Sequence, residues 1–162
     1  MRVAGYPRVS TEEQAEDGYS IQEQIESIQK WCKDNGHPPA VIEPYVDDGY
    51  SAKDLKRPGI KRLIEDVKGK KYDIIITTKL NRLSRKLLDI LNLIDLMEKN
   101  GCSYVSEQEK FDTSTYIGRM QMQMLGVISE FDRERISEDV RNTMKSIARN
   151  SANTKKVFTT PC

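Results

Sequence analysis

The chain has 162 residues, of which 37% are hydrophobic and 31% charged, and its 26 Lys and Arg balance 25 Asp and Glu to a formal net charge of +1. That composition is typical of a globular protein with one core, and three widely spaced cysteines fit neither a disulfide framework nor a metal site. Charged residues appear by position 8 and no apolar run could span a bilayer, so we expect a cytoplasmic protein with no membrane partner.

The stretch Tyr6–Gln14 is the first that carries chemistry. A short apolar run ends there and a polar helix-forming segment begins, which predicts a strand followed by a loop. The working residues of open α/β sheets gather just past the carboxyl ends of strands, so Arg8 and Ser10 would be presented together, as suits attack of a hydroxyl on a phosphate. The simpler alternative is that Ser10 and Thr11 only cap the next helix, and this stretch alone favours the cap.

The next predicted elements are a helix, a short strand and a turn. Ser20 and Glu23 have the spacing of a capping box, and apolar residues recur at helical spacing until Asn35–Gly36. Residues 41–45 are a short strand candidate, and residues 47–51 are rich in turn-forming residues.

A basic segment follows the most apolar predicted strand. After a helix that opens at Arg57–Pro58, residues 72–78 are β-branched and apolar on both faces, as in a buried parallel strand. The three cations of the next segment are spaced by three: Lys79, Arg82 and Arg85. The last two would share a helix face near a helix start that favours phosphate, and the common sheet edge would bring them beside Arg8 and Ser10. The competing interpretation is a solvated basic turn.

One long helix is predicted at the end of the chain. Residues 115–149 contain no proline, which at 1.5 Å per residue gives a helix of roughly 50 Å. A helix over residues 86–99 and a strand over residues 103–106 precede it. The first half of the long helix is apolar beyond a single stripe, so we weigh contact with another subunit and packing onto the sheet about evenly. These elements predict an α/β fold with a mostly parallel central sheet and flanking helices, followed by one long C-terminal α-helix.

The end of the chain is basic. Residues 141–162 carry five Lys or Arg and no Asp or Glu, a net charge of +5. Such an arm on a nearly neutral body suits an anionic polymer as partner, although a solvated tail would look similar.

Six blocks of the sequence, in their order and spacing, resemble the catalytic domain of the serine recombinases (resolvases and invertases). The likeness is closest to the large members, the phage integrases and transposon excision enzymes. The blocks are Tyr6–Thr11 with Gln14, Asp48–Ser51, Arg57–Pro58, Lys79–Arg85, Phe111–Ser114 with Gly118, and Glu130–Glu134. The resemblance covers residues 3–148 and implies a resolvase-like catalytic fold.

What the resemblance implies is conservative site-specific recombination of double-stranded DNA. Ser10 would attack the scissile phosphodiester and form a 5′-phosphoserine link, and the free 3′-hydroxyl would be kept for rejoining. Dimers and a synaptic tetramer, assembled through the long helix, would exchange strands by rotation of one half against the other. No metal or cofactor is implied.

The resemblance also assigns residues. The active-site positions of the family fall on Arg8, Gln14, Arg57, Asn81, Arg82 and Arg85 beside Ser10. The positions expected to contact DNA are Lys79, Arg141, Lys145 and Arg149. The arginines would hold the phosphate and offset charge in the transition state. With Arg82 taken as an exposed cation, its replacement should impair cleavage far more than stability.

Three departures from the family pattern matter. Asn81 stands where Asp is more common, which removes a carboxylate that could assist proton transfer at Ser10. Pro7 withdraws a backbone donor next to Arg8. Asp139 lies near the usual position of an arginine on the long helix, which puts the DNA-facing role of that stretch in question.

The expected organisation has three parts. Residues 1–113 would be the catalytic core, residues 114–150 a helix for oligomerisation and DNA approach, and residues 151–162 a basic tail that leads into absent DNA-binding domains. One alternative is a non-catalytic DNA-binding or assembly module with the same fold, favoured by Asn81 and Pro7. Another is a flavodoxin-like phosphate or nucleotide binder, which the lack of a Gly-rich loop after the first strand disfavours.

Overall fold

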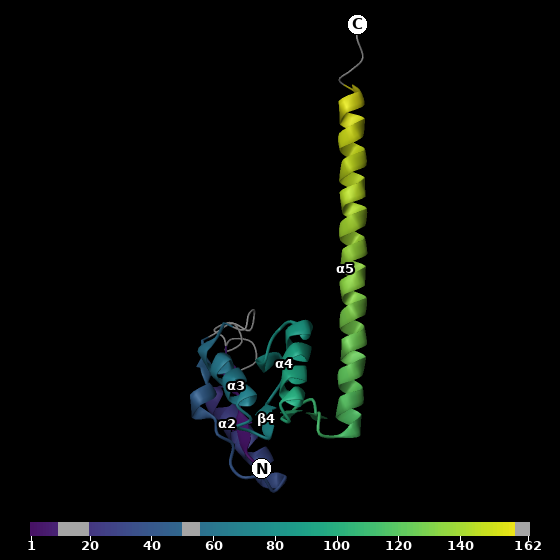
Figure 1. The fold of residues 1–162 in the computed structure, drawn as a ribbon. Coiled ribbons are helices and arrows are strands. Elements are labelled where there is room, and N and C mark those ends of the chain that lie inside the picture. The colour runs from purple at the N-terminus through teal and green to yellow at the C-terminus, as the bar shows by residue number, and fades with distance from the viewer. Residues whose placement is uncertain (10–19, 50–55, 158–162) are drawn as a thin grey trace. The chain divides into compact units, whose positions relative to one another are not determined.

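The computed structural model describes residues 1–9, 20–49 and 56–157, and the chain divides into two units, Met1–Leu125 and Gly126–Cys162 (Figure 1). The first unit holds a mixed α/β fold. The second holds the continuation of the last helix, α5, which runs through the division between the units.

A four-stranded sheet of order β1-β4-β5-β6 forms the centre of the first unit. Its strands are β1 (Val3–Gly5), β4 (Ile74–Thr77), β5 (Ser103–Ser106) and β6 (Phe111–Asp112). The first three are parallel, with Ile75 of β4 opposite Ala4 and Tyr104, and β6 is antiparallel to β5. The predicted mostly parallel sheet is therefore confirmed.

Helices flank the sheet (Figure 1). They are α2 (Ile21–Asp34), α3 (Pro58–Lys68), α4 (Leu87–Lys99) and α5 (Tyr116–Val157), with the 3-10 helices η1 (Glu43–Tyr45) and η2 (Leu80–Arg82). The predicted capping box starts α2: the Ser20 hydroxyl accepts from the Glu23 amide at 3.2 Å, and the Glu23 carboxylate accepts from the Ser20 amide at 2.7 Å. Gly36, with φ of 68°, takes the left-handed conformation just after the helix end.

The two faces of β4 belong to two separate apolar clusters. Ile75 joins side chains of α3 and α4, among them Leu63 and Leu93, whereas Ile74 and Ile76 join those of α2. Full burial of such a side chain stabilises the fold by about 2 kcal/mol. Ile74, Ile75 and Ile76 are all apolar because both faces of the strand are covered, as the sequence predicts.

A second, two-stranded sheet corrects two predictions. β2 (Arg8–Val9) pairs in parallel with β3 (Asp47–Asp48), with Arg8 opposite Asp47. Arg8 therefore lies in a strand and not in the predicted loop. Residues 47–48 are likewise paired, and Gly49, with φ of 78°, has the backbone of a turn residue. Residues 50–51 of the predicted turn lie outside the described residues.

The predicted strand over residues 41–45 is wrong. Val41 makes one isolated parallel bridge with Ala4, and the chain then enters η1. Pro44 lies in η1 and has no amide hydrogen for a strand ladder, which is the physical reason that pairing stops there.

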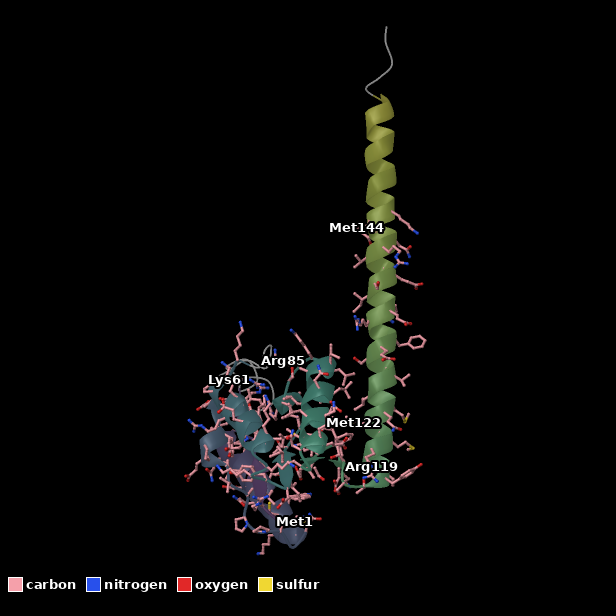
Figure 2. All side chains as sticks on the ribbon, viewed as in Figure 1. Met1, Lys61, Arg85, Arg119, Met122 and Met144 are labelled. Atoms are coloured by element: carbon pink, nitrogen blue, oxygen red, sulfur yellow. The ribbon has the colours of Figure 1, made fainter. Side chains whose placement is uncertain are left out.

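The long helix is confirmed, and it is longer than predicted. α5 spans 42 residues through Val157 and so takes in residues 151–157 of the predicted tail. Near its start, Met122 and Leu125 pack against the core of the first unit (Figure 2). Other apolar side chains of the helix are exposed, including Tyr116 at 76% and Phe131 at 72%. Packing onto the core is therefore confirmed for Met122 and Leu125, whereas contact of the exposed side chains with another subunit stays a prediction.

Candidate active site

Three arginines are buried together with the turn that follows β4. Arg8 is 0% exposed, and Arg57 and Arg82 are each 1% exposed. They come from β2, from the residue before α3, and from η2. We call these three residues the arginine cluster. Three guanidinium groups buried at one place form a strongly cationic site, which suits an anion.

The backbone carbonyls of the η2 turn hold the arginine cluster. Arg8 donates from Nε to the Arg82 oxygen at 3.1 Å and from Nη2 to the Asn81 oxygen at 3.2 Å. Arg57 donates from Nη1 to the same Arg82 oxygen at 3.2 Å, and from Nη2 to the Leu83 oxygen. One carbonyl therefore binds two guanidinium groups and sets their separation. The predicted meeting of Arg8 with the segment after β4 is confirmed.

Tyr6 and Asp47 support Arg57. The Tyr6 hydroxyl donates to the Asp47 carboxylate at 2.7 Å, and that carboxylate accepts the amides of Gly59 and Ile60 at 2.8 and 3.1 Å. Asp47 thereby caps the first turn of α3, which Arg57 itself does not cap with its side chain. The guanidinium of Arg57 lies 5.7 Å from the centre of the Tyr6 ring.

Burial and the bond to Asp47 also decide the ionisation of Tyr6. Desolvation, which disfavours the phenolate, and the nearby carboxylate raise the pKa of Tyr6 far above its ordinary value. The Tyr6 hydroxyl is consequently a fixed hydrogen-bond donor, which makes it a positioning group for Asp47.

Gln24 of α2 fixes the main chain of Arg8. Its side-chain oxygen accepts from the Arg8 amide at 3.2 Å, and its amide nitrogen donates to the Arg8 carbonyl at 3.0 Å. Gln24 is fully buried, so this pair of bonds is shielded from water. Gln24, Tyr6 and Asp47 were not predicted as residues of the site. For Gln24 the available signal was its position four and eight residues before Ile28 and Cys32, in line with the buried face of α2.

Arg82 and Arg85 do not share a helix face. Residues 80–82 form a 3-10 turn, and α4 begins only at Leu87. The turn directs Arg82 into the interior, while Arg85 is exposed on the surface of the first unit (Figure 2). The expectation that Arg82 is an exposed cation is therefore wrong.

Asn81 and Lys79 are half-buried residues of the same segment. Within the described residues, the Asn81 side-chain oxygen is buried without a hydrogen-bond partner, an arrangement that calls for a ligand or a functional reason. Lys79 precedes η2 and provides no side-chain cap for it. Its contact with DNA stays a prediction.

The remaining predicted site residues either lie outside the described residues or belong to α5. Ser10 and Gln14 lie outside the described residues; in the sequence Ser10 directly follows β2. Arg141 and Lys145 are exposed on α5 in the second unit. Arg149 belongs to the span of α5.

Metal-binding clusters and membrane-spanning helices are both absent from the described part of the chain. Residues 1–9, 20–49 and 56–157 contain no group of three His, Cys, Asp or Glu side chains placed to hold a metal ion. None of the helices in these ranges is long and apolar enough to cross a membrane.

Comparisons with known proteins agree on one family. Residues 3–153 match the family described as Resolvase, N terminal domain. A putative DNA recombinase of Bacillus subtilis is 36% identical over 136 residues, which cover 84% of this chain and 26% of that protein.

Solved structures give the same result. The N-terminal catalytic domain of TP901-1 integrase aligns with a TM-score of 0.74 and 38% identity, covering 83% of this chain and 98% of that one. A resolvase family site-specific recombinase from Streptococcus pneumoniae aligns with a TM-score of 0.76 and 26% identity, covering 92% and 99%. The chain spans 26%, 43% and 65% of the lengths of three curated relatives that it matches.

Proposed function

This chain belongs to the resolvase N-terminal domain family of serine recombinases, and from that premise we propose that it catalyses site-specific DNA recombination through a 5′-phosphoserine intermediate. The observation that carries the proposal is the buried arginine cluster held by the η2 carbonyls. The likeness to the TP901-1 integrase domain favours the large, integrase-type members.

The arginine cluster has the chemistry that phosphoryl transfer needs. Three guanidinium groups buried at one place concentrate positive charge there. A phosphodiester brings a full negative charge, and guanidinium forks match its oxygens geometrically. Charge on these oxygens builds in the transition state, so preorganised cations at this position would lower the barrier.

In the proposed reaction the Ser10 oxygen forms a bond to phosphorus while the bond from phosphorus to the 3′-oxygen breaks. The hydroxyl proton leaves Ser10, and the released 3′-oxygen takes up a proton. One phosphoester replaces another, so the reverse attack by a 3′-hydroxyl can rejoin the strands without an energy source. Arg8, Arg57 and Arg82 would bind the phosphate, with Arg85 and Gln14 as further contacts.

Asn81 would have a limited role in this reaction. An amide oxygen accepts a hydrogen bond but does not ionise near neutral pH, so Asn81 could orient the Ser10 hydroxyl and could not carry its proton away. The buried Asn81 oxygen without a partner among the described residues supports this assignment.

The proposed partners are double-stranded DNA and further copies of the chain. Lys79 and the exposed cations Arg141 and Lys145, together with Arg149, would contact DNA phosphates in the cytoplasm. The exposed apolar side chains of α5 support assembly into dimers and tetramers through this helix. In this assignment residues 1–113 are the catalytic core and residues 114–150 the assembly helix.

A covalent trap tests the proposal. The protein is incubated with a pool of duplexes of randomised sequence that each carry one nick. Cleavage near the nick releases a short fragment, and its loss prevents rejoining, so the adduct accumulates. Denaturing gels should show a protein–DNA adduct at a 5′ end, and the Ser10→Ala variant should show none. Ser114→Ala, which removes an exposed serine hydroxyl, is the matched control and should form the adduct at the wild-type rate.

Two outcomes would count against the proposal. An adduct that persists in Ser10→Ala would remove Ser10 as nucleophile. DNA binding without any adduct in the wild type would favour the non-catalytic module.

A further inference from the structure

The turn between β5 and β6 lies against the segment that joins β4 to η2. The amide of Glu107 donates to the Thr77 carbonyl and that of Gln108 to the Thr78 carbonyl, each at 3.0 Å. These bonds extend the contact between β4 and β5 past the ends of both strands. The turn therefore reaches the first residue of η2.

Glu109 completes this contact with its side chain. Its two carboxylate oxygens accept from the Leu80 amide at 3.3 and 3.2 Å, and the Ser106 hydroxyl donates to the same carboxylate. Leu80 is the first residue of η2, whose preceding residue provides no side-chain cap. Glu109 thus satisfies a free amide at the start of η2 from a distant part of the chain.

The backbone of Lys110 closes the turn that carries Glu109. Lys110 has φ of 51°, a left-handed conformation that non-glycine residues seldom adopt and that costs free energy. The Lys110 amide donates to the Glu107 carbonyl at 3.4 Å, which closes the turn. A strained residue is retained where surrounding contacts fix it, as the bonds to η2 do here.

We propose that Glu109 is a positioning residue for the arginine cluster, acting through the η2 turn. The carbonyls of Asn81, Arg82 and Leu83 hold Arg8 and Arg57, so a displacement of η2 displaces both guanidinium groups. Glu109 holds the other end of this turn. Misplacement of catalytic groups by about 1 Å can cost roughly 100-fold in rate. The catalytic part of this inference rests on the proposed function.

Glu107 provides a matched control in the same turn. Its carboxylate accepts from the Ser27 hydroxyl of α2 at 3.0 Å and so joins a different element. Glu107→Ala and Glu109→Ala remove the same atoms and the same charge two residues apart. Only the second removes the acceptor of the Leu80 amide.

The experiment compares Glu109→Ala, Glu109→Gln and Glu107→Ala by two readouts. Amide hydrogen exchange of Leu80, followed by NMR, reports the hold on η2 without any substrate. The rate of Ser10 adduct formation on the nicked duplex pool reports the effect on chemistry. Glu109→Ala should raise the hydrogen-exchange rate of the Leu80 amide and lower the rate of adduct formation, each by about tenfold or more. Glu109→Gln keeps a carbonyl acceptor, so its Leu80 exchange rate and its adduct rate should both lie near those of the wild type. Glu107→Ala should match the wild type in both rates.

Several results would overturn the inference. Equal effects of Glu107→Ala and Glu109→Ala would show a general role of the turn. Unchanged Leu80 exchange in Glu109→Ala would show that η2 does not depend on Glu109, and an unchanged adduct rate would show that Glu109 does not position the arginine cluster for the reaction. If Glu109→Ala fails to fold, Glu109→Gln decides: near-wild-type exchange and adduct rates are the expected result, and a lost adduct rate with unchanged Leu80 exchange would overturn the inference. A wild type without adduct refutes the proposed function, while the exchange readout still decides whether Glu109 holds η2.

Discussion

The two units of the chain differ in how far they bury charged and apolar side chains. In Met1–Leu125 the arginine cluster is buried, and apolar residues cover both faces of β4. In the second unit, within the part whose side chains are described up to residue 145, no residue is buried, and Phe131, Val140 and Met144 are more than half exposed (Figure 2).

This difference shows which contacts stabilise each unit. The first unit is specified by contacts within itself, so changes there should affect stability and activity together. The second is a helix whose side chains face outward, and helices gain most of their stability in proteins from packing. Substitutions in the second unit should affect association with DNA or other copies while leaving the first unit intact.

The sharpest test of the contrast is a pair of glycines on α5. A Cβ added at Gly118 would lie 1.8 Å from the Asp112 carbonyl oxygen, so backbone would have to move. Gly118→Ala should lower the free energy of unfolding by about 3 kcal/mol. A Cβ at Gly126 meets nothing within 4 Å, and alanine is the better helix former by about 1 kcal/mol. Gly126→Ala should therefore be neutral or stabilising in thermal unfolding followed by circular dichroism. Equal effects at the two positions would contradict the contrast.

A pair of arginines gives the next largest effect. Arg57→Ala would leave buried carbonyls of η2 short of a donor and should cost about 2 kcal/mol in urea unfolding. Arg141→Ala removes an exposed cation and should change stability by less than about 0.5 kcal/mol. A comparable loss in Arg141→Ala would show that the second unit has structure-forming contacts of its own.

The smallest expected effect is the contribution of the Asp66 carboxylate to stability, which depends on pH. Hydrogen bonds from Tyr45 and from Lys71, the latter at 3.1 Å, hold the pKa of Asp66 below its ordinary value. The ionised carboxylate thus stabilises the first unit above about pH 4, and this contribution is lost as the pH falls through the lowered pKa. Asp66→Asn should melt below the wild type at neutral pH, with a gap that narrows in acid.

Asp139→Asn is the matched substitution on the exposed helix. It should leave the stability within about 0.5 kcal/mol of the wild type at neutral pH. A gap for Asp66→Asn that stays constant down to low pH would show that the carboxylate charge contributes nothing.

Much of the fold could be predicted because its elements carry local signals. Residues 74–77 are β-branched and apolar, the Ser20 and Glu23 pair starts a helix, and a proline-free stretch forms α5. The errors occurred where local signals were weak: two-residue strands such as β2 and β3 are too short for periodicity, and Pro44 ended the strand expected over residues 41–45.

Only part of the candidate site could be predicted in the same way. The rule that strand ends share an edge placed Arg82 beside Arg8, and the family resemblance added Arg57 to the site. Neither indicated that Arg82 is buried, because a 3-10 turn and an α-helix have the same residue preferences over three positions.

Taken by itself, the sequence determined which chemistry is present: a serine next to arginines, a family of enzymes, and a long helix with a basic end. The tertiary structure decided how that chemistry is held. Arg8 and Arg57 are fixed by main-chain carbonyls, and η2 is fixed by Glu109 from 29 residues away. Every residue has a carbonyl, so contacts of this kind leave no signature in residue type and exist only once the backbone has folded.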